Sequence, residues 1–284
     1  MSLNKYLSFV KFAHTVFAMP FAMIGYFLGT AYAGVGFSWQ TFLLVILCMV
    51  FARNAAMSFN RYADRFIDAK NPRTEDREIP SNVIKPQAAL VFVIANAIAF
   101  MIACRFLNML VFYLSPVALL VVLGYSFTKK YTSLCHFVLG TGLSLAPVGA
   151  YLAVTGVFAW LPVMFSFVVL LWSGGFDIIY ALQDEDFDVQ ERLHSIPAWV
   201  GKRNALIISA LAHTVAGALV VVIGFFWDFG VWYATGAAIF LFLLLYQHLI
   251  VKPNDLNRVN AAFFTSNGIA SVVFAGFVIL DLLL

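Results

Sequence analysis

Two groups of polar residues in this chain have the spacing of metal and phosphate chemistry. Asn60, Asp64 and Asp68 recur every four residues and form the first carboxylate group, and Asp184 and Asp188 form the second. On a helix, residues four apart share one face, so each group predicts a polar stripe. Because Mg²⁺ uses one or two carboxylates together with substrate phosphate oxygens, the facing stripes predict on the order of two or three Mg²⁺ ions that hold a diphosphate. All five residues are candidate metal ligands, and the four aspartates are candidate catalytic residues.

Basic residues flank both carboxylate groups and offer positive charge to the same anion. The candidates for binding the diphosphate are Arg61, Arg65, Arg73, Arg77, Lys129, Lys130 and Arg192. The alternative interpretation is that the carboxylates and these basic residues are solvated loop charges, as most charge runs are.

The elements that position these residues are transmembrane helices. Of 284 residues, 63% are hydrophobic and 11% are charged, with a mean hydropathy of +0.92, whereas a soluble domain carries about 25% charged residues. Apolar runs near the ~20 residues that cross a bilayer recur along the chain without alternating at period two, which favours helices over a barrel. The sequence therefore predicts an all-α integral membrane protein that forms a single domain over residues 1–284. Nine transmembrane spans are expected, at 14–33, 42–61, 88–106, 109–127, 134–154, 160–181, 203–224, 228–250 and 262–283.

The basic residues also orient the chain in the membrane. When the loops are assigned alternately to the two sides, every Lys and Arg falls on the side of the N-terminus except Arg105, outside, and Arg53, within a span. The positive-inside rule then places the N-terminus and both carboxylate groups at the cytoplasmic face of the cell (inner) membrane. Most acidic residues lie in or next to Asp64–Glu78 and Asp177–Glu191, which marks that face as the site. The net charge of +3 is too small to suggest a nucleic-acid partner.

Two ionisable residues lie deeper than the carboxylate groups. Arg53 precedes Asn60 by seven residues and Asp177 precedes Asp184 by seven, which is two helical turns, or about 10 Å further into the membrane. An ionisable group at that depth is a functional hypothesis by default. Arg53 is the candidate receptor for an anionic aromatic acceptor, with Tyr180 beside it, and Asp177 is a further catalytic candidate. The alternatives are that Arg53 and Asp177 pair with each other, and that Tyr180 is an interfacial aromatic.

The two carboxylate segments resemble each other. Each has a DxxxD pair that is followed by the pattern IPxxVxK, at Ile79–Lys85 and Ile196–Lys202. Each follows an even-numbered span, so this repeat predicts two related four-helix halves, at about 1–130 and 131–250, plus a ninth helix around a central polar cavity. Repeats with buried charges are also typical of secondary transporters, which are the alternative from another class. Transporter sites usually lie near the membrane midplane, whereas these carboxylates gather at one face.

At these residues the chain resembles the UbiA superfamily of intramembrane prenyltransferases. RNAAMSFNRYADRFIDAKNPRT, at Arg53–Thr74, resembles the family's first motif, NxxxDxxxD, with its upstream arginine. DIIYALQDEDFD, at Asp177–Asp188, resembles the second motif in the form seen in 4-hydroxybenzoate polyprenyltransferases, and SFTKKYT, at Ser126–Thr132, resembles the basic loop after the fourth helix. Glu78 stands where many members have proline, which implies a more flexible and more acidic cap loop.

The resemblance implies nine helices around a polar cavity under a cytoplasmic cap, with both carboxylate groups holding Mg²⁺ and polyprenyl diphosphate. It implies an enzyme that transfers the polyprenyl group to a small aromatic acid, such as 4-hydroxybenzoate, within membrane lipid and in ubiquinone or menaquinone biosynthesis. The opening segment is most similar to the branch from organisms that make menaquinone by the futalosine route, which points to a different aromatic acid. Naphthoate, haem and a glycerol phosphate lipid are the alternative acceptors within the family.

Overall fold

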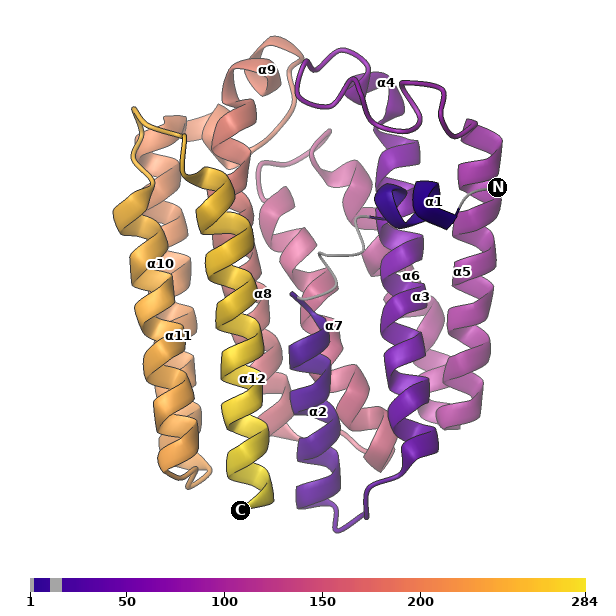
Figure 1. The fold of residues 1–284 in the computed structure, drawn as a ribbon, viewed down its shortest axis with the longest axis vertical. Helices are drawn as coiled ribbons and strands as arrows, with labels where there is room; N and C mark the ends of the chain where they lie inside the picture. The colour runs from indigo at the N-terminus through magenta and orange to yellow at the C-terminus, as the bar shows by residue number, and fades with distance from the viewer. Residues whose placement is uncertain (1–2, 11–16) are drawn as a thin grey trace.

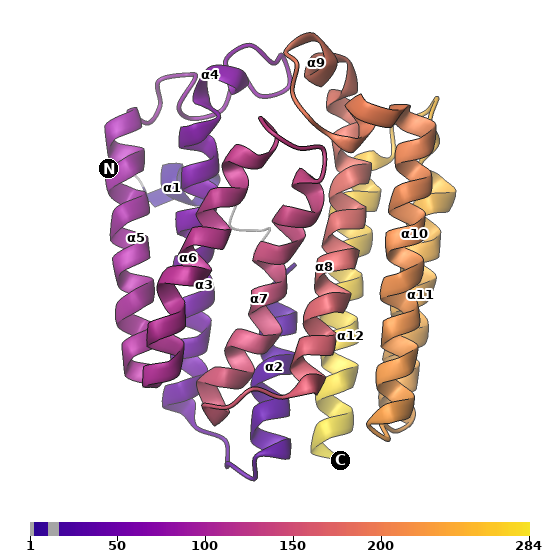
Figure 2. The ribbon, with the colours of Figure 1, turned by 180° about the vertical axis from the view of Figure 1, so that it is seen from behind.

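The computed structural model describes residues 3–10 and 17–284 as a bundle of long helices that run side by side (Figures 1 and 2). The first expected span begins at residue 14, which lies outside the described residues. The α-helices are α1 (Leu3–Phe9), α2 (Met19–Tyr32), α3 (Trp39–Ala63), α4 (Arg65–Asp68), α5 (Pro86–Leu107), α6 (Met109–Thr128), α7 (Cys135–Thr155), α8 (Trp160–Ala181), α9 (Glu185–Gln190), α10 (Ile196–Phe226), α11 (Val231–Ile250) and α12 (Asn267–Leu283). A 3-10 turn covers Leu182–Asp184, and a π-helical segment covers Ala261–Ser266.

Eight helices over the described residues are long and apolar enough to cross a membrane. They are α3, α5, α6, α7, α8, α10, α11 and α12; α8 is counted with the 3-10 turn and α9 after it, and α12 with the π-helical segment before it. The described part of the first expected span is α2, with 14 residues. Over these residues the structure contains no β-sheet, only an isolated bridge between Lys252 and Asp255. The prediction of an all-α, multi-pass membrane protein is confirmed, and the described residues hold eight candidate spans against the nine expected.

Local sequence signals set the helix boundaries. The Ser38 hydroxyl accepts a hydrogen bond from the backbone N–H of Thr41 and caps the start of α3. Pro86 occupies the first turn of α5, where a missing N–H costs nothing. α7 ends at Gly156, whose φ of 69° is a left-handed conformation that glycine adopts without a steric penalty.

Both carboxylate groups lie where a long helix breaks. α3 ends at Ala63, Asp64 leaves the helical conformation with φ −93° and ψ 0°, and the short α4 follows. α8 is likewise followed by the 3-10 turn and by α9. The expectation of two unbroken helical stripes is therefore corrected, because each long helix ends before the first aspartate of its group. The N–H groups of Asp64 and Asp68 still donate to the carbonyls four residues earlier, at 2.9 and 2.8 Å.

The two breaks lie at the same end of the bundle. In Figures 1 and 2, α4, α9 and their loops cover one end of the molecule, and the C-terminus lies at the other. We call residues 69–85, between α4 and α5, the cap loop. α1 packs against this loop, because Phe9 and Val10 share a buried cluster with Ile79 and Ile84.

Close packing brings α7 against α8. A Cβ atom on Gly140 of α7 would lie 2.5 Å from the Leu170 carbonyl oxygen of α8, so only glycine fits this contact. Small residues at such positions let membrane helices approach closely. A large apolar cluster around Trp172 then fixes α8 against α11 and α12, and the Trp172 indole donates to the buried Asn267 side chain at 2.8 Å. The rigid α7–α8 pair carries one side of the site.

Candidate active site

One cavity of about 800 Å³ receives both carboxylate groups. Its polar end, which we call the mouth, is lined by Asn60, Asp64, Asp68, Asp184 and Asp188. Four of the seven candidate diphosphate-binding residues also line the cavity, namely Arg61, Arg73, Arg77 and Lys129. The deeper candidates Arg53, Asp177 and Tyr180 lie on its wall as well. The structure therefore brings together side chains that the sequence separates by more than a hundred positions.

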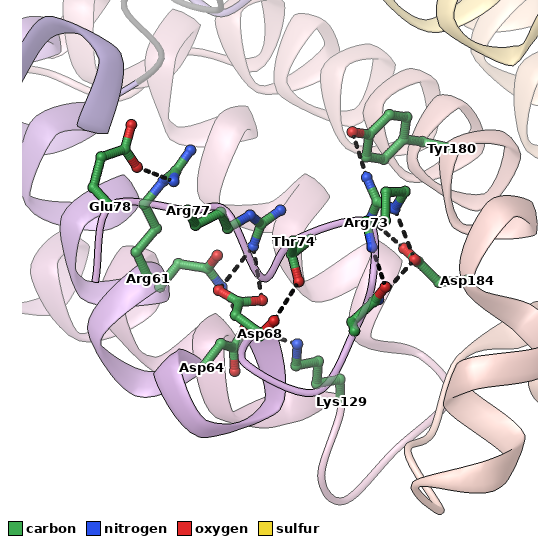
Figure 3. Close-up of polar contacts among 12 residues, drawn as sticks. Arg61, Asp64, Asp68, Arg73, Thr74, Arg77, Glu78, Lys129, Tyr180 and Asp184 are labelled. Atoms are coloured by element: carbon green, nitrogen blue, oxygen red, sulfur yellow. Dashed lines mark hydrogen bonds and ion pairs between the residues drawn. The ribbon is translucent and has the colours of Figure 1, made fainter. Parts of the chain in front are cut away.

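Asp64 offers the mouth a carboxylate oxygen that has no hydrogen-bond partner. Its carboxylate is buried, and its Oδ2 accepts from Lys129 Nζ at 2.7 Å and from Asn60 Nδ2 at 3.2 Å (Figure 3). The Oδ1 atom is buried without a hydrogen-bond partner. Burial raises the pKa of Asp64 above its usual value, while Lys129 acts in the opposite direction. A buried carboxylate oxygen without a hydrogen-bond partner is suited to bind a cation.

Asp68 is held by the cap loop. The Arg77 guanidinium donates to both of its carboxylate oxygens, at 2.9 and 3.0 Å. Thr74 of the same loop donates its hydroxyl to the Asp68 carbonyl oxygen at 3.1 Å. Both contacts are visible in Figure 3. The first carboxylate group and the cap loop therefore form one rigid unit.

Arg73 joins the two carboxylate groups across the mouth. It extends from the cap loop and forms an ion pair with Asp184, to which its Nε donates at 2.8 Å (Figure 3). Its Nη1 donates to the Tyr180 hydroxyl at 2.8 Å, and Asn71 adds a hydrogen bond to Asp184 at 3.1 Å. Burial lowers the pKa of Arg73, but the hydrogen bonds to Asp184 and Tyr180 outweigh it and raise the pKa. Tyr180 thus faces the cavity, not the membrane interface.

Glu78 forms an ion pair with Arg61, a second arginine of the mouth. Arg61 is almost fully buried and donates to Glu78 Oε2 at 2.5 Å, while Ser8 of α1 donates to the other carboxylate oxygen at 2.7 Å. The residue that departs from the family pattern therefore connects α1, the cap loop and α3. The sequence implied a flexible and acidic cap loop, but at Glu78 this loop is held by the contacts to Arg61 and Ser8.

Three of the predicted diphosphate-binding residues are not brought to the cavity in the described part of the chain. The Arg65 guanidinium lies 4.4 and 4.3 Å from the ring centroids of Tyr62 and Phe66, and Arg65 donates to the Tyr62 carbonyl at 2.6 Å. Lys130 and Arg192 are exposed. Lys129 and Lys130 both follow the end of α6 at Thr128, and only Lys129 lines the cavity.

Asp177 has a partner that the sequence analysis missed. His136 of α7 places its Nδ1 atom 2.7 Å from Asp177 Oδ2. The Ile196 backbone N–H donates to the other ring nitrogen at 3.2 Å. A lone histidine at the edge of an apolar run carries no motif, so no spacing signal announced it. Asp177 thus has a histidine partner, whereas the sequence offered Arg53 as a possible one.

Below the mouth the cavity becomes apolar. We call this part the deep arm; its lining includes Val45, Leu114, Val121, Leu143 and Val148. Both His136 and Ala153 of α7 line the cavity, so it follows α7 for about 25 Å at 1.5 Å per residue. Such an arm suits an extended apolar chain.

The donor set fits a metal ion that shares its ligands with a phosphate. Among the described residues, no three His, Cys, Asp or Glu side chains are grouped closely enough to hold a metal by themselves. Mg²⁺ does not require such a group, because it is commonly bound by one or two carboxylates plus substrate phosphates. The unpartnered Oδ1 of Asp64 meets that requirement.

The fold is that of a multi-pass membrane protein, and its cavity is polar at one end and apolar at the other. The profile of the UbiA prenyltransferase family matches residues 18–268. The chain therefore belongs to this family and is a prenyltransferase.

Relatives and solved structures agree with this assignment. The chain is 29% identical over 245 residues to a 4-hydroxybenzoate octaprenyltransferase from Vibrio parahaemolyticus, covering 85% of each protein. It is similar to the apo structure of a UbiA homolog from Aeropyrum pernix K1, with a TM-score of 0.85, 29% identity and coverage of 94% of this chain and 98% of that one. A UbiA homolog from Archaeoglobus fulgidus bound to DMAPP and Mg²⁺ shares the fold, with a TM-score of 0.76, 18% identity and 99% coverage of both chains.

Proposed function

We propose that this protein transfers a polyprenyl group from polyprenyl diphosphate to an aromatic acid of the 4-hydroxybenzoate type, with Mg²⁺, in quinone biosynthesis. The observation that carries the proposal is the convergence of both carboxylate groups and four basic residues on the mouth of a cavity whose deep arm is apolar. This arrangement suits a diphosphate at one end and its isoprenoid tail at the other.

The comparisons support the same substrates. The relative from Vibrio parahaemolyticus is a 4-hydroxybenzoate octaprenyltransferase. The homolog from Archaeoglobus fulgidus was solved with DMAPP and Mg²⁺. We extend to this chain the use of a prenyl diphosphate, of Mg²⁺ and of an aromatic acid acceptor.

The residues of the mouth have two proposed roles: some bind the metal, and others bind the diphosphate directly. Asn60, Asp64, Asp68, Asp184 and Asp188 would hold Mg²⁺. When bound, this ion neutralises negative charge on the departing diphosphate. Arg61, Arg73, Arg77 and Lys129 provide fixed positive charge at the same place, where negative charge develops in the transition state.

The wall between the mouth and the deep arm receives the acceptor. In this proposal Arg53 binds the carboxylate of the aromatic acid, and Tyr180 packs beside its ring. The bond between the prenyl carbon and the diphosphate oxygen breaks, and the aromatic ring forms a new carbon–carbon bond to that prenyl carbon. The apolar lining of the deep arm keeps water away from the allylic cation.

The proposal also covers the placement of the chain. The basic residues favour a cytoplasmic N-terminus and a mouth that opens to the cytoplasm, in the inner membrane. α3 and α8, which precede the two carboxylate groups, are each the second long helix of a run of four. We infer related halves at about 1–130 and 131–250 from this order and from the repeated motif.

Product formation by the purified protein tests the proposal. The protein is incubated with Mg²⁺, geranyl diphosphate and a panel of acceptors that contains hydroxylated aromatic acids, a naphthoate, haem and a glycerol phosphate lipid. Prenylated products are identified by mass spectrometry. We expect a product with a 4-hydroxybenzoate-type acid, and its loss in Asp184→Ala. Turnover only with a naphthoate, haem or a glycerol phosphate lipid would refute the aromatic-acid assignment in favour of that acceptor.

A further inference from the structure

His136 connects α7, α8 and the start of α10 at the wall of the cavity where the aromatic acceptor is proposed to bind. It lies in the first turn of α7, its side chain is 3% exposed, and it lines the cavity. One ring nitrogen contacts Asp177 of α8, and the other accepts from the backbone of Ile196 at the start of α10. The Gly140 contact one turn further along α7 holds α7 and α8 close enough for this pairing. The ring therefore has a fixed position between rigid helices.

The two hydrogen bonds define which nitrogen of His136 carries the proton. A backbone N–H is only a donor, so the Nε2 atom that faces Ile196 must be the acceptor. In the neutral ring the hydrogen is then on Nδ1, and it is donated to Asp177 Oδ2 at 2.7 Å. The second oxygen of Asp177 remains for the cavity, to which this side chain is 22% exposed.

Asp177 differs from three of the four carboxylates of the mouth in its partner. Asp64, Asp68 and Asp184 form ion pairs with Lys129, Arg77 and Arg73, respectively. Protonating any of these would break an ion pair with a permanent cation. Asp177 is held by a histidine, which carries no permanent charge, so Asp177 takes up a proton without breaking a pair with a permanent cation.

We propose that His136 is a positioning residue, which holds Asp177 so that its carboxylate removes the proton that the aromatic ring loses during prenylation. This inference rests on the proposed function. As the prenyl–oxygen bond breaks, its electron pair leaves with the diphosphate, and a ring carbon beside the hydroxyl bonds to the prenyl carbon. The C–H bond at that ring carbon then breaks; its electrons restore the aromatic ring, and its proton goes to Asp177. The protonated Asp177 returns its proton to water when the product leaves.

A ring-deuterated acceptor reports on this proton transfer. Turnover is measured with Mg²⁺, geranyl diphosphate and 4-hydroxybenzoate that carries either hydrogen or deuterium at both positions beside the hydroxyl. In the parent enzyme, proton loss to a well-placed base is fast, so we expect equal rates with the two acceptors. In His136→Leu, the misplaced carboxylate makes proton loss slow. We expect kcat to fall about 10²-fold, the effect of a small displacement of a reacting group, with a deuterium isotope effect and an unchanged KM for geranyl diphosphate.

Two further variants keep the test decisive. In His136→Gln the amide N–H donates to Asp177 and the amide oxygen accepts from Ile196, so turnover returns and the isotope effect disappears. Asp177→Asn still accepts the hydrogen bond from His136 but takes no proton, so kcat falls and the isotope effect appears. If His136→Leu does not fold, His136→Gln and Asp177→Asn decide the matter. His194→Leu, at an exposed histidine of the cytoplasmic loops, is the matched control and keeps the parent rate.

The outcomes separate this inference from the function on which it rests. A parent enzyme that prenylates no aromatic acid refutes the proposed function. A parent enzyme that forms the product, together with variants at His136 and Asp177 that keep its rate or lose rate without an isotope effect, overturns the role of this pair in proton removal.

Discussion

Replacing Asp64 with asparagine separates the stability of the protein from its catalysis. Burial raises the pKa of Asp64, so the folded protein holds the charged carboxylate at a cost. Because the pKa of the folded state is raised, this cost is present at neutral pH and disappears as the pH falls. Asparagine has nearly the same shape and no charge, so Asp64→Asn removes the cost at every pH.

The magnitudes for stability and activity differ widely. The variant loses the ion pair with Lys129, whose side chain is 29% exposed and is therefore solvated when left alone. Because water replaces Asp64 at the partly exposed Lys129, the loss of this pair costs about 0–1 kcal/mol, which the removed burial cost of Asp64 offsets. Loss of one charged group that stabilises the transition state lowers kcat by about 10²–10³-fold, or about 2.7–4 kcal/mol. We expect the unfolding temperature to stay within about 4 °C of the parent, since 1 kcal/mol corresponds to about 2–4 °C in a chain of this order of size.

Parallel measurements on two variants test this separation. Thermal unfolding in detergent and the rate of geranyl transfer are measured for Asp64→Asn and for Asp76→Asn, an exposed carboxylate on the same cap loop. The control keeps both properties. Asp64→Asn with a rate within threefold of the parent would refute the catalytic role, and a large drop in unfolding temperature would refute the argument from burial.

Three further predictions concern the neighbours of this carboxylate. Lys129→Met removes the cation that opposes burial, so the pKa of Asp64 rises further. Because the proposed metal site uses the charged carboxylate, we expect the acid limb of the kcat/KM profile against pH to move to higher pH, and an unmoved limb contradicts this. Glu78→Ala leaves the buried Arg61 without its carboxylate, which lowers stability by about 3–5 kcal/mol. Inorganic diphosphate then raises the unfolding temperature more in this variant than in the parent; an equal rise argues against Arg61 as an anion-binding residue. Leu114→Trp fills the deep arm about 22 Å along α6 from Lys129. We expect it to slow the transfer of long polyprenyl chains and to spare the transfer of geranyl. Equal losses for both donors would show that the tail does not enter the deep arm.

The convergence of the two carboxylate groups was predictable from the sequence. Their spacing of four places the side chains on one side of the chain, and the parity of the spans places both groups at one face of the membrane. Neither argument depends on the exact helix boundaries. The structure therefore keeps both groups on one cavity even though α3 and α8 end before Asp68 and Asp188 are reached.

The distribution of the arginines was only partly predictable. Arg61 lies three residues before Asp64, which is the same helical face, whereas Arg65 follows Asp64 directly and points about 100° away. The helical period therefore favours Arg61, and treating both as equal candidates overlooked that signal. The pairing of Arg73 with Asp184 was beyond such reasoning. It depends on where an irregular loop places its side chains, and no periodicity describes a loop.

The contacts of His136 could not be predicted from the sequence. Its two partners lie 41 and 60 positions away in the sequence. The pairing requires that α7 and α8 meet at the correct rotation, which the packing at Gly140 sets. Sequence patterns report the face on which a residue lies, but they do not report the rotation of one apolar helix against another.

The ion pairs at the mouth also explain why metal and diphosphate should bind together. Arg73 and Arg77 extend from one loop and neutralise aspartates from both carboxylate groups. A cation that takes Asp184 or Asp68 leaves the arginine without its anion, and a diphosphate that takes an arginine leaves the aspartate without its cation. Breaking a partly buried ion pair is costly when only one partner is replaced. When metal and diphosphate arrive together, every charge keeps a counter-charge, so the affinity for each is raised by the presence of the other. Under the proposed function, Arg73 and Arg77 would therefore exchange their aspartates for the diphosphate, and Asp184 and Asp68 would exchange the arginines for the metal.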